Sequence, residues 1–312
     1  MDEKLWDDLF TEGRKWGLVS YEQDWLNDEF FGMKALTTDI NNAKVWLTLM
    51  GKSARKNGIT IQYCMSNCRH AMQSLELPAV TQARVSDDYS PGQDQWKIGI
   101  SSIFAYAMGV APFKDNFWST TNQSGNPYSR SEPYNGLNAV VSTLSTGPVG
   151  PSDKIGLSNV SLIMRCCNDD GLILKPSKPA TAIDSQIYQI TGYKIFSMDK
   201  PGQLTDFSDK SPVSITPACS KIDFCLYYVS PVLKTSPEVV ILGELSKWVP
   251  VSPQRVQEIS QSDDIIITIT GKQSESVTFS FSVDGVIRSI NCVLGSSGTA
   301  QIHVEAMKCL SS

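Results

Sequence analysis

The clearest strand-to-loop passage in the sequence is Ala79-Val80-Thr81-Gln82-Ala83-Arg84-Val85-Ser86-Asp87-Asp88-Tyr89-Ser90-Pro91. It opens with small and apolar residues, which predict a short strand. An arginine, two adjacent carboxylates and a proline follow, and they are typical of a turn. In α/β barrels the carboxyl end of a strand is where catalytic side chains lie. A solvated turn is the simpler explanation of this stretch alone, so the rest of the chain must distinguish the two interpretations.

The composition is that of a chain large enough for one large domain and a smaller one. The sequence has 312 residues, of which 41% are hydrophobic. The net charge is −5 and no basic run is present, so we expect no nucleic-acid partner. No apolar stretch approaches the roughly 18 residues of a membrane span, and none is expected. The oligomeric state is not indicated.

The cellular compartment stays open at this stage. The amphipathic N-terminus lacks the apolar core of a signal peptide. Two sequons, Asn122-Gln123-Ser124 and Asn159-Val160-Ser161, fit a secreted protein. A secreted or lysosomal location would require N-terminal residues that precede this sequence.

The cysteines and histidines predict no metal site. Cys64 and Cys68 are close in sequence, but no second pair and no histidine cluster completes a zinc set. His70 and His303 are far apart, and neither lies in a context typical of Ser-His-Asp or Cys-His catalysis. We therefore expect no metal and no cofactor.

Residues 1–185 alternate short strands with helices, which is the pattern of parallel βαβ units. The expected helices are 2–16, 39–56, 68–75, 97–109, 132–144 and 157–167, and the strand passages are 17–26, 59–66, 79–91, 109–119 and 147–154. About five βα units are visible, whereas a closed (β/α)8 barrel needs eight strands. The pattern predicts an α/β fold, namely the second half of a TIM barrel without its first three strands.

From residue 186 onward the helical periodicity is lost. Strands are expected at 187–198, 222–230, 238–243, 263–270, 276–283 and 286–295, with turns such as Asp284-Gly285 between them. A proline-rich junction at 174–181 precedes this region. We predict two domains: a partial (β/α) barrel at 1–185 and an all-β antiparallel sandwich at 186–312.

The predicted strand ends carry the candidate site. Asp24 and Asp88 end alternate strands and can face each other across a barrel, as the two carboxylates of a glycosidase do. One would attack the anomeric carbon or position water, and the other would protonate the leaving oxygen. The further candidates for contacts with a sugar are Trp25, Cys64, Arg84, Tyr89, Asp115, Trp118, Ser152 and Asp153.

Each of these side chains also has a purely structural explanation. Asp24 can cap a helix or lie in a loop, and the tryptophans can belong to the core. Arg84 can pair with Asp87 on the surface. Cys64 can be a small buried hydrophobic residue.

Four motifs follow one another along the predicted strand ends. They are Tyr63-Cys64-Met65-Ser66, Arg84-Val85-Ser86-Asp87-Asp88-Tyr89, Asp115-Asn116-Phe117-Trp118-Ser119 and Gly147-Pro148-Val149-Gly150-Pro151-Ser152-Asp153-Lys154-Ile155-Gly156. Their order resembles the strand ends of the α-galactosidase and raffinose synthase group, glycoside hydrolase family 36 and its clan. Asp170-Gly171-Leu172-Ile173-Leu174 resembles the segment that follows the barrel in raffinose synthase-like proteins. The resemblance covers about residues 17–185.

The resemblance implies retaining cleavage or transfer of an α-linked glycoside, α-galactosides included, without a metal. It implies that Asp24 is the nucleophile. It makes Asp88 the acid/base, four residues after Arg84 as in the clan's Arg-x-x-x-Asp pattern. Cys64, Arg84 and Asp115 fall where the family contacts its sugar. The implied partner is a carbohydrate.

Two departures from the family pattern favour an alternative. The family usually has a lysine two residues before the nucleophile, where this chain has Glu22. The first three strands are also absent, and half a barrel exposes an unpaired parallel edge. The alternative is a catalytically inactive relative that binds carbohydrate or is structural, or an inactive fragment of such an enzyme. The retained Asp24 and Asp88 favour the enzyme.

Overall fold

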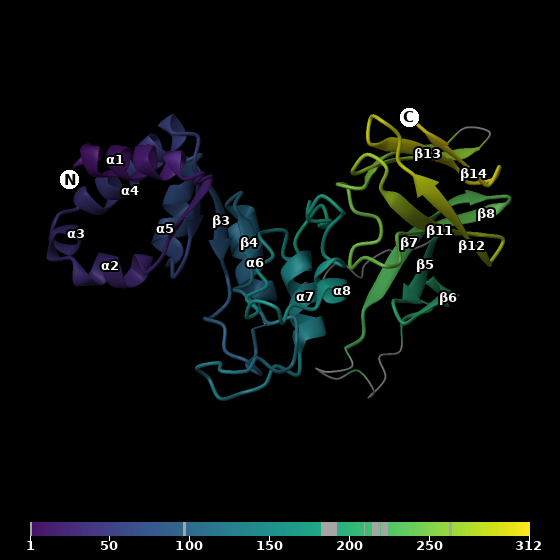
Figure 1. Cartoon of the computed structure of the whole chain (residues 1–312), viewed down its shortest axis with the longest axis horizontal. Coiled ribbons are helices and arrows are strands. Elements are labelled where there is room, and N and C mark those ends of the chain that lie inside the picture. The colour runs from purple at the N-terminus through teal and green to yellow at the C-terminus, as the bar shows by residue number, and fades with distance from the viewer. Residues whose placement is uncertain are drawn as a thin grey trace.

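The computed structural model describes residues 2–95, 98–181, 192–208, 210–213, 219, 224–261 and 264–312. Figure 1 shows an elongated molecule, with an α/β part that contains the N-terminus at one end and a β part that contains the C-terminus at the other. None of the described helices combines the length and the apolar character that crossing a membrane requires.

The α/β part contains a parallel sheet. Its strands, in the order in which they pair, are β1 (Ser20–Gln23), β2 (Thr60–Tyr63), β3 (Val80–Arg84) and β4 (Ala111–Phe113). Its helices are α1 (Glu3–Lys15), α2 (Leu26–Gly32), α3 (Lys34–Thr38), α4 (Asn42–Lys56), α5 (Cys68–Gln73), α6 (Gly99–Ala107), α7 (Asn135–Leu144) and α8 (Val160–Ile163), and η1 (Ser74–Glu76) is a 3-10 turn. The predicted parallel sheet is confirmed.

The first helix shows how the sequence fixes these elements. The Asp2 carboxylate caps α1 by accepting a hydrogen bond from the Lys4 backbone N–H at 2.9 Å. One apolar face buries Trp6 and Phe10. These rings join a core cluster with Leu47 of α4 and with side chains of the sheet. The helix therefore covers one face of the sheet through its apolar stripe.

The fifth predicted strand passage lies beside β4 and its continuation. Phe117 and Pro151 form a parallel bridge, and the Phe117 N–H donates to the Gly150 carbonyl at 3.1 Å. A Cβ at Gly147 would lie 2.6 Å from the Pro112 carbonyl oxygen. Only glycine permits this approach, so the turn at Gly147 brings the fifth passage to the sheet.

The β part consists of antiparallel sheets that include a curled half-barrel. Its strands are β5 (Tyr193–Ser197), β6 (Lys200–Phe207), β7 (Tyr227–Thr235), β8 (Glu238–Gly243), β9 (Val256–Gln261), β10 (Ile265–Thr270), β11 (Ser276–Val283), β12 (Val286–Val293), β13 (Thr299–His303) and β14 (Lys308–Ser311). The described strands pair in the orders β12-β11-β8-β7-β5-β6 and β14-β13-β10-β9. Buried side chains of both sheets form one core cluster.

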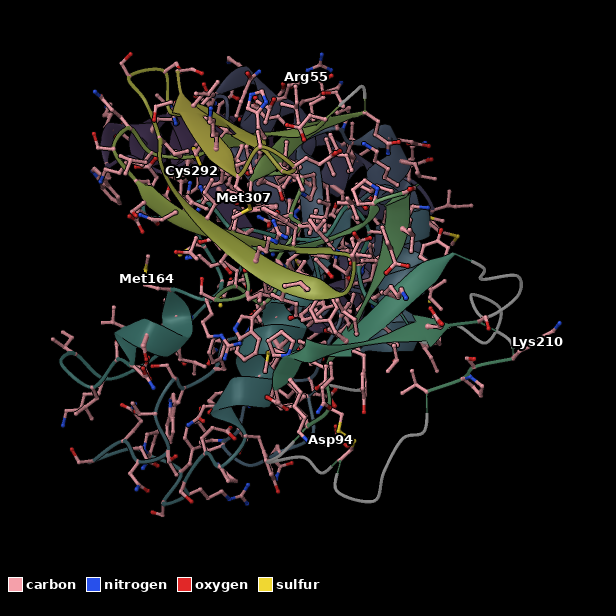
Figure 2. The ribbon with its side chains drawn as sticks, turned by 90° about the vertical axis from the view of Figure 1, so that its right-hand side faces the viewer. Arg55, Asp94, Met164, Lys210, Cys292 and Met307 are labelled. Atoms are coloured by element: carbon pink, nitrogen blue, oxygen red, sulfur yellow. A yellow bond between two sulfur atoms is a disulfide. The ribbon has the colours of Figure 1, made fainter. Side chains whose placement is uncertain are left out.

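Two disulfides lie in this part. Cys292 of β12 pairs with Cys309 of β14, and so links the two sheets; Figure 2 labels Cys292. Cys219 pairs with Cys225, and their Cα atoms are 5.2 Å apart.

The β part is attached to the segment that follows α8. Lys247 donates from Nζ to the carbonyls of Met164 and Cys167, both at 2.8 Å. The Trp248 N–H donates to the Arg165 carbonyl at 3.0 Å. The Arg165 guanidinium lies 3.4 Å from the centre of the Trp248 ring, which is a close cation–π contact.

Several predicted bounds differ from the structure. The expected helix 157–167 is only α8, because Asn159 caps it at 3.2 Å and the chain soon enters turns. Helices α2 and α3 and strands β6, β9, β13 and β14 were not predicted. The predicted domain boundary at 185/186, residue 97 of a predicted helix, and the predicted strand residues 187–191, 222–223 and 263 lie outside the described residues.

A buried charge network stabilises the β part. Arg255 has a side chain only 1% exposed, and it pairs with Glu244 at 2.9 Å and with Glu275 at 2.6 Å. The Glu275 carboxylate also accepts the Asp169 N–H at 3.3 Å, so the network reaches the segment after α8. Removing one partner from such a network leaves a buried charge without its counter-ion.

We expect Arg255→Met to lower the free energy of unfolding by about 3–5 kcal/mol, because two buried carboxylates lose their cation. Urea denaturation followed by tryptophan fluorescence measures this. Arg288→Met, at an exposed position of β12, is the matched control and should change stability by at most ~0.5 kcal/mol. Equal effects of the two substitutions would contradict the prediction.

Candidate functional site

The parallel sheet brings four predicted site residues to one edge. Asp24 follows β1, Cys64 follows β2, Arg84 ends β3 and Asp115 follows β4. Because neighbouring parallel strands run in the same direction, their carboxyl ends lie side by side. The distances between these side chains show which of them contact one another.

Arg84 is the centre of these contacts. Its side chain is 10% exposed, and Nη2 lies 2.7 Å from Asp88 Oδ1 while Nη1 lies 3.6 Å from Asp115 Oδ2. Burial opposes the guanidinium charge, but the neighbouring groups of Cys64, Asp115 and Asp88 outweigh it and raise the pKa of Arg84. The structural alternative considered for Arg84 was a surface pair with Asp87, but the carboxylate that it binds is that of Asp88.

Asp24 and Cys64 lie next to each other at the ends of β1 and β2. Cys64 is fully buried, and burial, together with a hydrogen bond to Asp24, raises the pKa of its thiol. Asp24 Oδ1 accepts the backbone N–H of Trp25 at 2.7 Å. Trp25 has a left-handed backbone, with φ 57°, and its side chain is exposed rather than part of the core. Cys64 is thus hydrogen-bonded to Asp24 and lies within the electrostatic influence of Arg84.

Glu22 joins this end of the site. One ligand atom each of Glu22, Asp24 and Cys64 lies within 4.8 Å of the other two. Carboxylates and a thiolate can ligate zinc, so these three residues are the set at this edge that could hold a cation. The nearby Arg84 guanidinium, which interacts electrostatically with Cys64, opposes a positive ion there.

Asp115 fixes the loop that follows β3. Its Oδ2 accepts the Tyr89 N–H at 2.6 Å, and its own N–H donates to Ser86 Oγ at 2.9 Å. The resulting loop leaves the Asp88 side chain 75% exposed while its carboxylate stays bound to Arg84. Asp115 therefore positions the loop that carries Asp88, in addition to its contact with Arg84.

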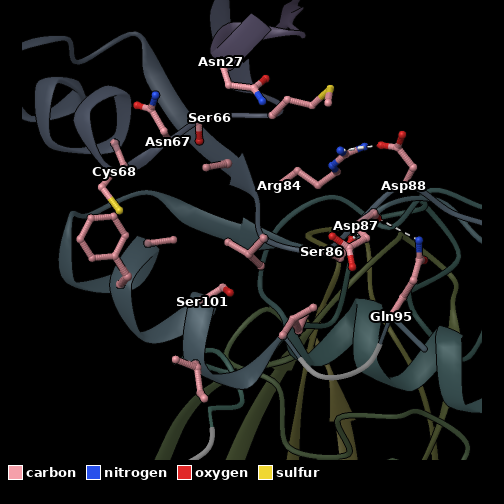
Figure 3. Close-up of a pocket in the computed structure, with 18 of the residues that line it drawn as sticks. Asn27, Ser66, Asn67, Cys68, Arg84, Ser86, Asp87, Asp88, Gln95 and Ser101 are labelled. Carbon is pink, nitrogen blue, oxygen red and sulfur yellow. Dashed lines mark hydrogen bonds and ion pairs between the residues drawn. The ribbon is translucent and has the colours of Figure 1, made fainter. Parts of the chain in front are cut away.

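A cavity of about 890 Å³ opens beside Arg84 and Asp88. Figure 3 shows this pair on one side, with Asn27 of α2 and with Ser66 and Asn67 of the loop after β2 across from it. Ile98 and Phe104, the latter in α6, add apolar surface. A few polar groups that converge on a partly apolar wall are typical of a small-molecule site.

A smaller cavity of about 420 Å³ contains the other predicted residues, Trp118, Ser152 and Asp153. The Asp153 carboxylate accepts from the Ser119 N–H at 2.8 Å, from Ser119 Oγ at 2.6 Å and from Gln123 Nε2 at 2.9 Å. Trp118 is only 5% exposed. These two side chains shape the wall of the cavity more than they face its interior.

Two buried charges near the site were missed by the sequence reasoning. Lys114 is 1% exposed, and burial lowers its pKa to about 7. Its Nζ donates to Gln95 Oε1 at 2.7 Å and to the carbonyls of Asp115 and Asn116. Glu132 is fully buried and accepts the Tyr89 hydroxyl at 2.9 Å. The only sequence signal was a lysine directly after the apolar residues of β4.

His70 is a buried, uncharged residue in α5, next to the larger cavity. Its Nδ1 accepts the Asn67 N–H at 3.2 Å, and the Asn67 side chain in turn accepts the His70 N–H. Burial, with a smaller contribution from Arg69, lowers the pKa of His70 to about 4. Protonation would break this capping box, since a protonated Nδ1 cannot accept.

Comparison with known proteins leaves the site to be interpreted from its own chemistry. No protein-family model matches the chain, and no curated protein sequence matches it either. The function is therefore inferred from the side chains at the sheet edge.

The lowered pKa of His70 predicts a loss of stability in acid. Between the ordinary value near 6.5 and the folded value near 4, the unfolded chain binds the proton first, so stability falls as the pH falls through this window. The loss reaches at most roughly 3 kcal/mol. Urea titrations at pH 7 and pH 4.5 on the native chain and on His70→Leu measure it. The variant should lose less stability than the native chain over this interval, and an equal loss would contradict the prediction.

Proposed function

We propose that the chain is a glycoside hydrolase-like protein that cleaves or transfers an α-linked glycoside with retention of configuration. The observation that carries the proposal is the ion pair of Arg84 with Asp88, both of which line a cavity of about 890 Å³ at the carboxyl end of the sheet. Glycosidic cleavage requires a second carboxylate on the other side of the bound sugar, and we assign this role to Asp24, which follows the strand β1 of the same sheet.

In the proposed reaction each carboxylate has one role. Asp24 attacks the anomeric carbon and forms a covalent glycosyl-enzyme, while the bond to the leaving oxygen breaks. Asp88 must first leave its ion pair with Arg84 and take up a proton; it then gives that proton to the leaving oxygen and afterwards removes one from the incoming water or sugar hydroxyl. Arg84, which already binds Asp88, positions this carboxyl group over the cavity.

The fold is consistent with a larger proposal, that residues 1–185 correspond to the second half of a (β/α)8 barrel. Four parallel strands and the fifth passage match the expected number of βα units. Among the described strands, β1 has a neighbour only on the side of β2. The disulfides of the β part fit an oxidising compartment, as a secreted or lysosomal protein would require.

A second candidate function is binding of carbohydrate without cleavage. The observation that favours it is Glu22, whose carboxylate lies within 4.8 Å of the ligand atoms of Asp24 and Cys64. An anion in place of the family's lysine repels the Asp24 carboxylate and changes how sugar hydroxyls are held. The same pocket would then bind a sugar but lack an effective nucleophile.

The test is hydrolysis of aryl α-glycosides by the chain and by Asp24→Asn and Asp88→Asn. We expect Asp24→Asn to abolish turnover, and Asp88→Asn to reduce it by about 10²–10⁴-fold. Asp28→Asn, at an exposed position of α2, is the control and should leave the rate unchanged. Proton NMR of the first product formed should show the α-anomer.

The outcomes separate the two candidates. An unchanged rate of hydrolysis in either variant contradicts the catalytic role proposed for the substituted residue. If calorimetry detects sugar binding but no hydrolysis is measured, the result supports the carbohydrate-binding function. Neither hydrolysis nor binding rejects both functions.

A further inference from the structure

The smaller cavity lies among the loops that follow β3, β4 and the fifth passage. It is lined by residues 123–128 and 152–154, together with Tyr89, Asn116 and Trp118. Asp88 lines the larger cavity, and Tyr89, the next residue, lines the smaller one. The wall between the two cavities is therefore the short loop that follows β3.

This wall is held rigidly on the side of the smaller cavity. The Tyr89 N–H donates to Asp115 Oδ2 at 2.6 Å, and its hydroxyl donates to the buried Glu132 at 2.9 Å. The Tyr89 ring packs edge to face against Trp118, with 6.0 Å between the ring centres. A ligand that occupies both cavities would pass over the rim of a fixed partition.

The opposite wall is also fixed before any ligand binds. Gln123 donates to Asp153 at 2.9 Å and accepts the Lys154 N–H at 2.9 Å. Asn126 donates to the Gln123 carbonyl at 2.7 Å and accepts the Tyr128 N–H at 3.0 Å. The amides of this loop thus hold one another in place, which lowers the entropy that a ligand must overcome.

Two side chains of this wall are available to a ligand. The Tyr128 ring is 43% exposed and rests against Trp118, whose ring centre is 6.0 Å away. Lys154 Nζ donates to the Ser124 carbonyl at 3.1 Å, and an ammonium group has three donors, more than this contact uses. The sequence predicted aromatic contacts from Trp25, Tyr89 and Trp118, but the exposed ring in the lining of this cavity is that of Tyr128.

We propose that the smaller cavity binds the second sugar unit of an α-linked oligosaccharide whose terminal unit occupies the larger cavity. The C–H face of the second sugar packs on Tyr128, and a hydroxyl accepts from Lys154. An aromatic face with a few convergent donors fits a ring that has one apolar face and a polar rim. This inference rests on the proposed function, since it assigns the neighbouring cavity to a sugar.

Isothermal titration calorimetry tests it with galactose, glucose, melibiose and isomaltose as probes. For the native chain, at least one disaccharide should bind about tenfold more tightly than its terminal monosaccharide. Tyr128→Ala should abolish this gain and leave monosaccharide binding unchanged, while Tyr128→Phe should keep it. Tyr106→Ala, on α6, removes a tyrosine of similar exposure (46%) that lines neither cavity, and it should change nothing.

The results distinguish this inference from the proposed function. A monosaccharide that binds as tightly as its disaccharide overturns the second subsite and leaves the proposed function standing. A Tyr128→Ala variant that weakens both sugars equally, or no more than Tyr106→Ala, also overturns it. If none of the four probes binds the native chain, both proposals fail.

Discussion

The buried guanidinium of Arg84 is the constraint on which the sheet edge depends. A charge that is 10% exposed at the end of a strand is costly unless carboxylates reach it. Asp115 reaches it from the end of β4, and Asp88 reaches it from the loop after β3. One cation therefore holds the end of β3, the end of β4 and the loop after β3 together. A loop that would otherwise be a solvated turn is bound to the sheet because its carboxylate neutralises this charge.

Two buried charged residues, Lys114 and Glu132, also hold the loop after β3 in place. Lys114 binds Gln95, whose amide donates to the Asp87 carbonyl at 2.9 Å, and Glu132 binds the Tyr89 hydroxyl. Lys114 also lies against the Tyr89 ring at 5.3 Å, and the burial of its ammonium group is why its pKa falls. The exposed carboxylate of Asp88 is thus carried by a backbone that is fixed at several points. Such preorganisation is what a group that must meet a substrate requires.

Hydrophobic periodicity predicted most of the fold correctly. It could not identify charged residues that are buried in the folded chain. The parallel and antiparallel regions, and the gathering of strand-end residues, result from apolar spacing and from the direction of parallel strands. Lys114 and Glu132 escaped notice, because a buried charge and a solvated one look alike in sequence. Strand β6 was missed because Lys200–Phe207 contains proline and glycine, which edge strands tolerate. Helix α2 was missed because it starts after the left-handed backbone of Trp25.

Glu22 is the residue that separates the enzyme from the binding protein, and electrostatics shows why. Its carboxylate lies within 4.8 Å of that of Asp24, so two acidic groups share the end of β1. In the transition state of glycoside cleavage, positive charge develops on the sugar ring. Two nearby carboxylates would both attract that charge. In the proposed reaction Glu22 therefore adds a second anion that stabilises the positive charge on the sugar ring, whereas a lysine at this position would repel that charge.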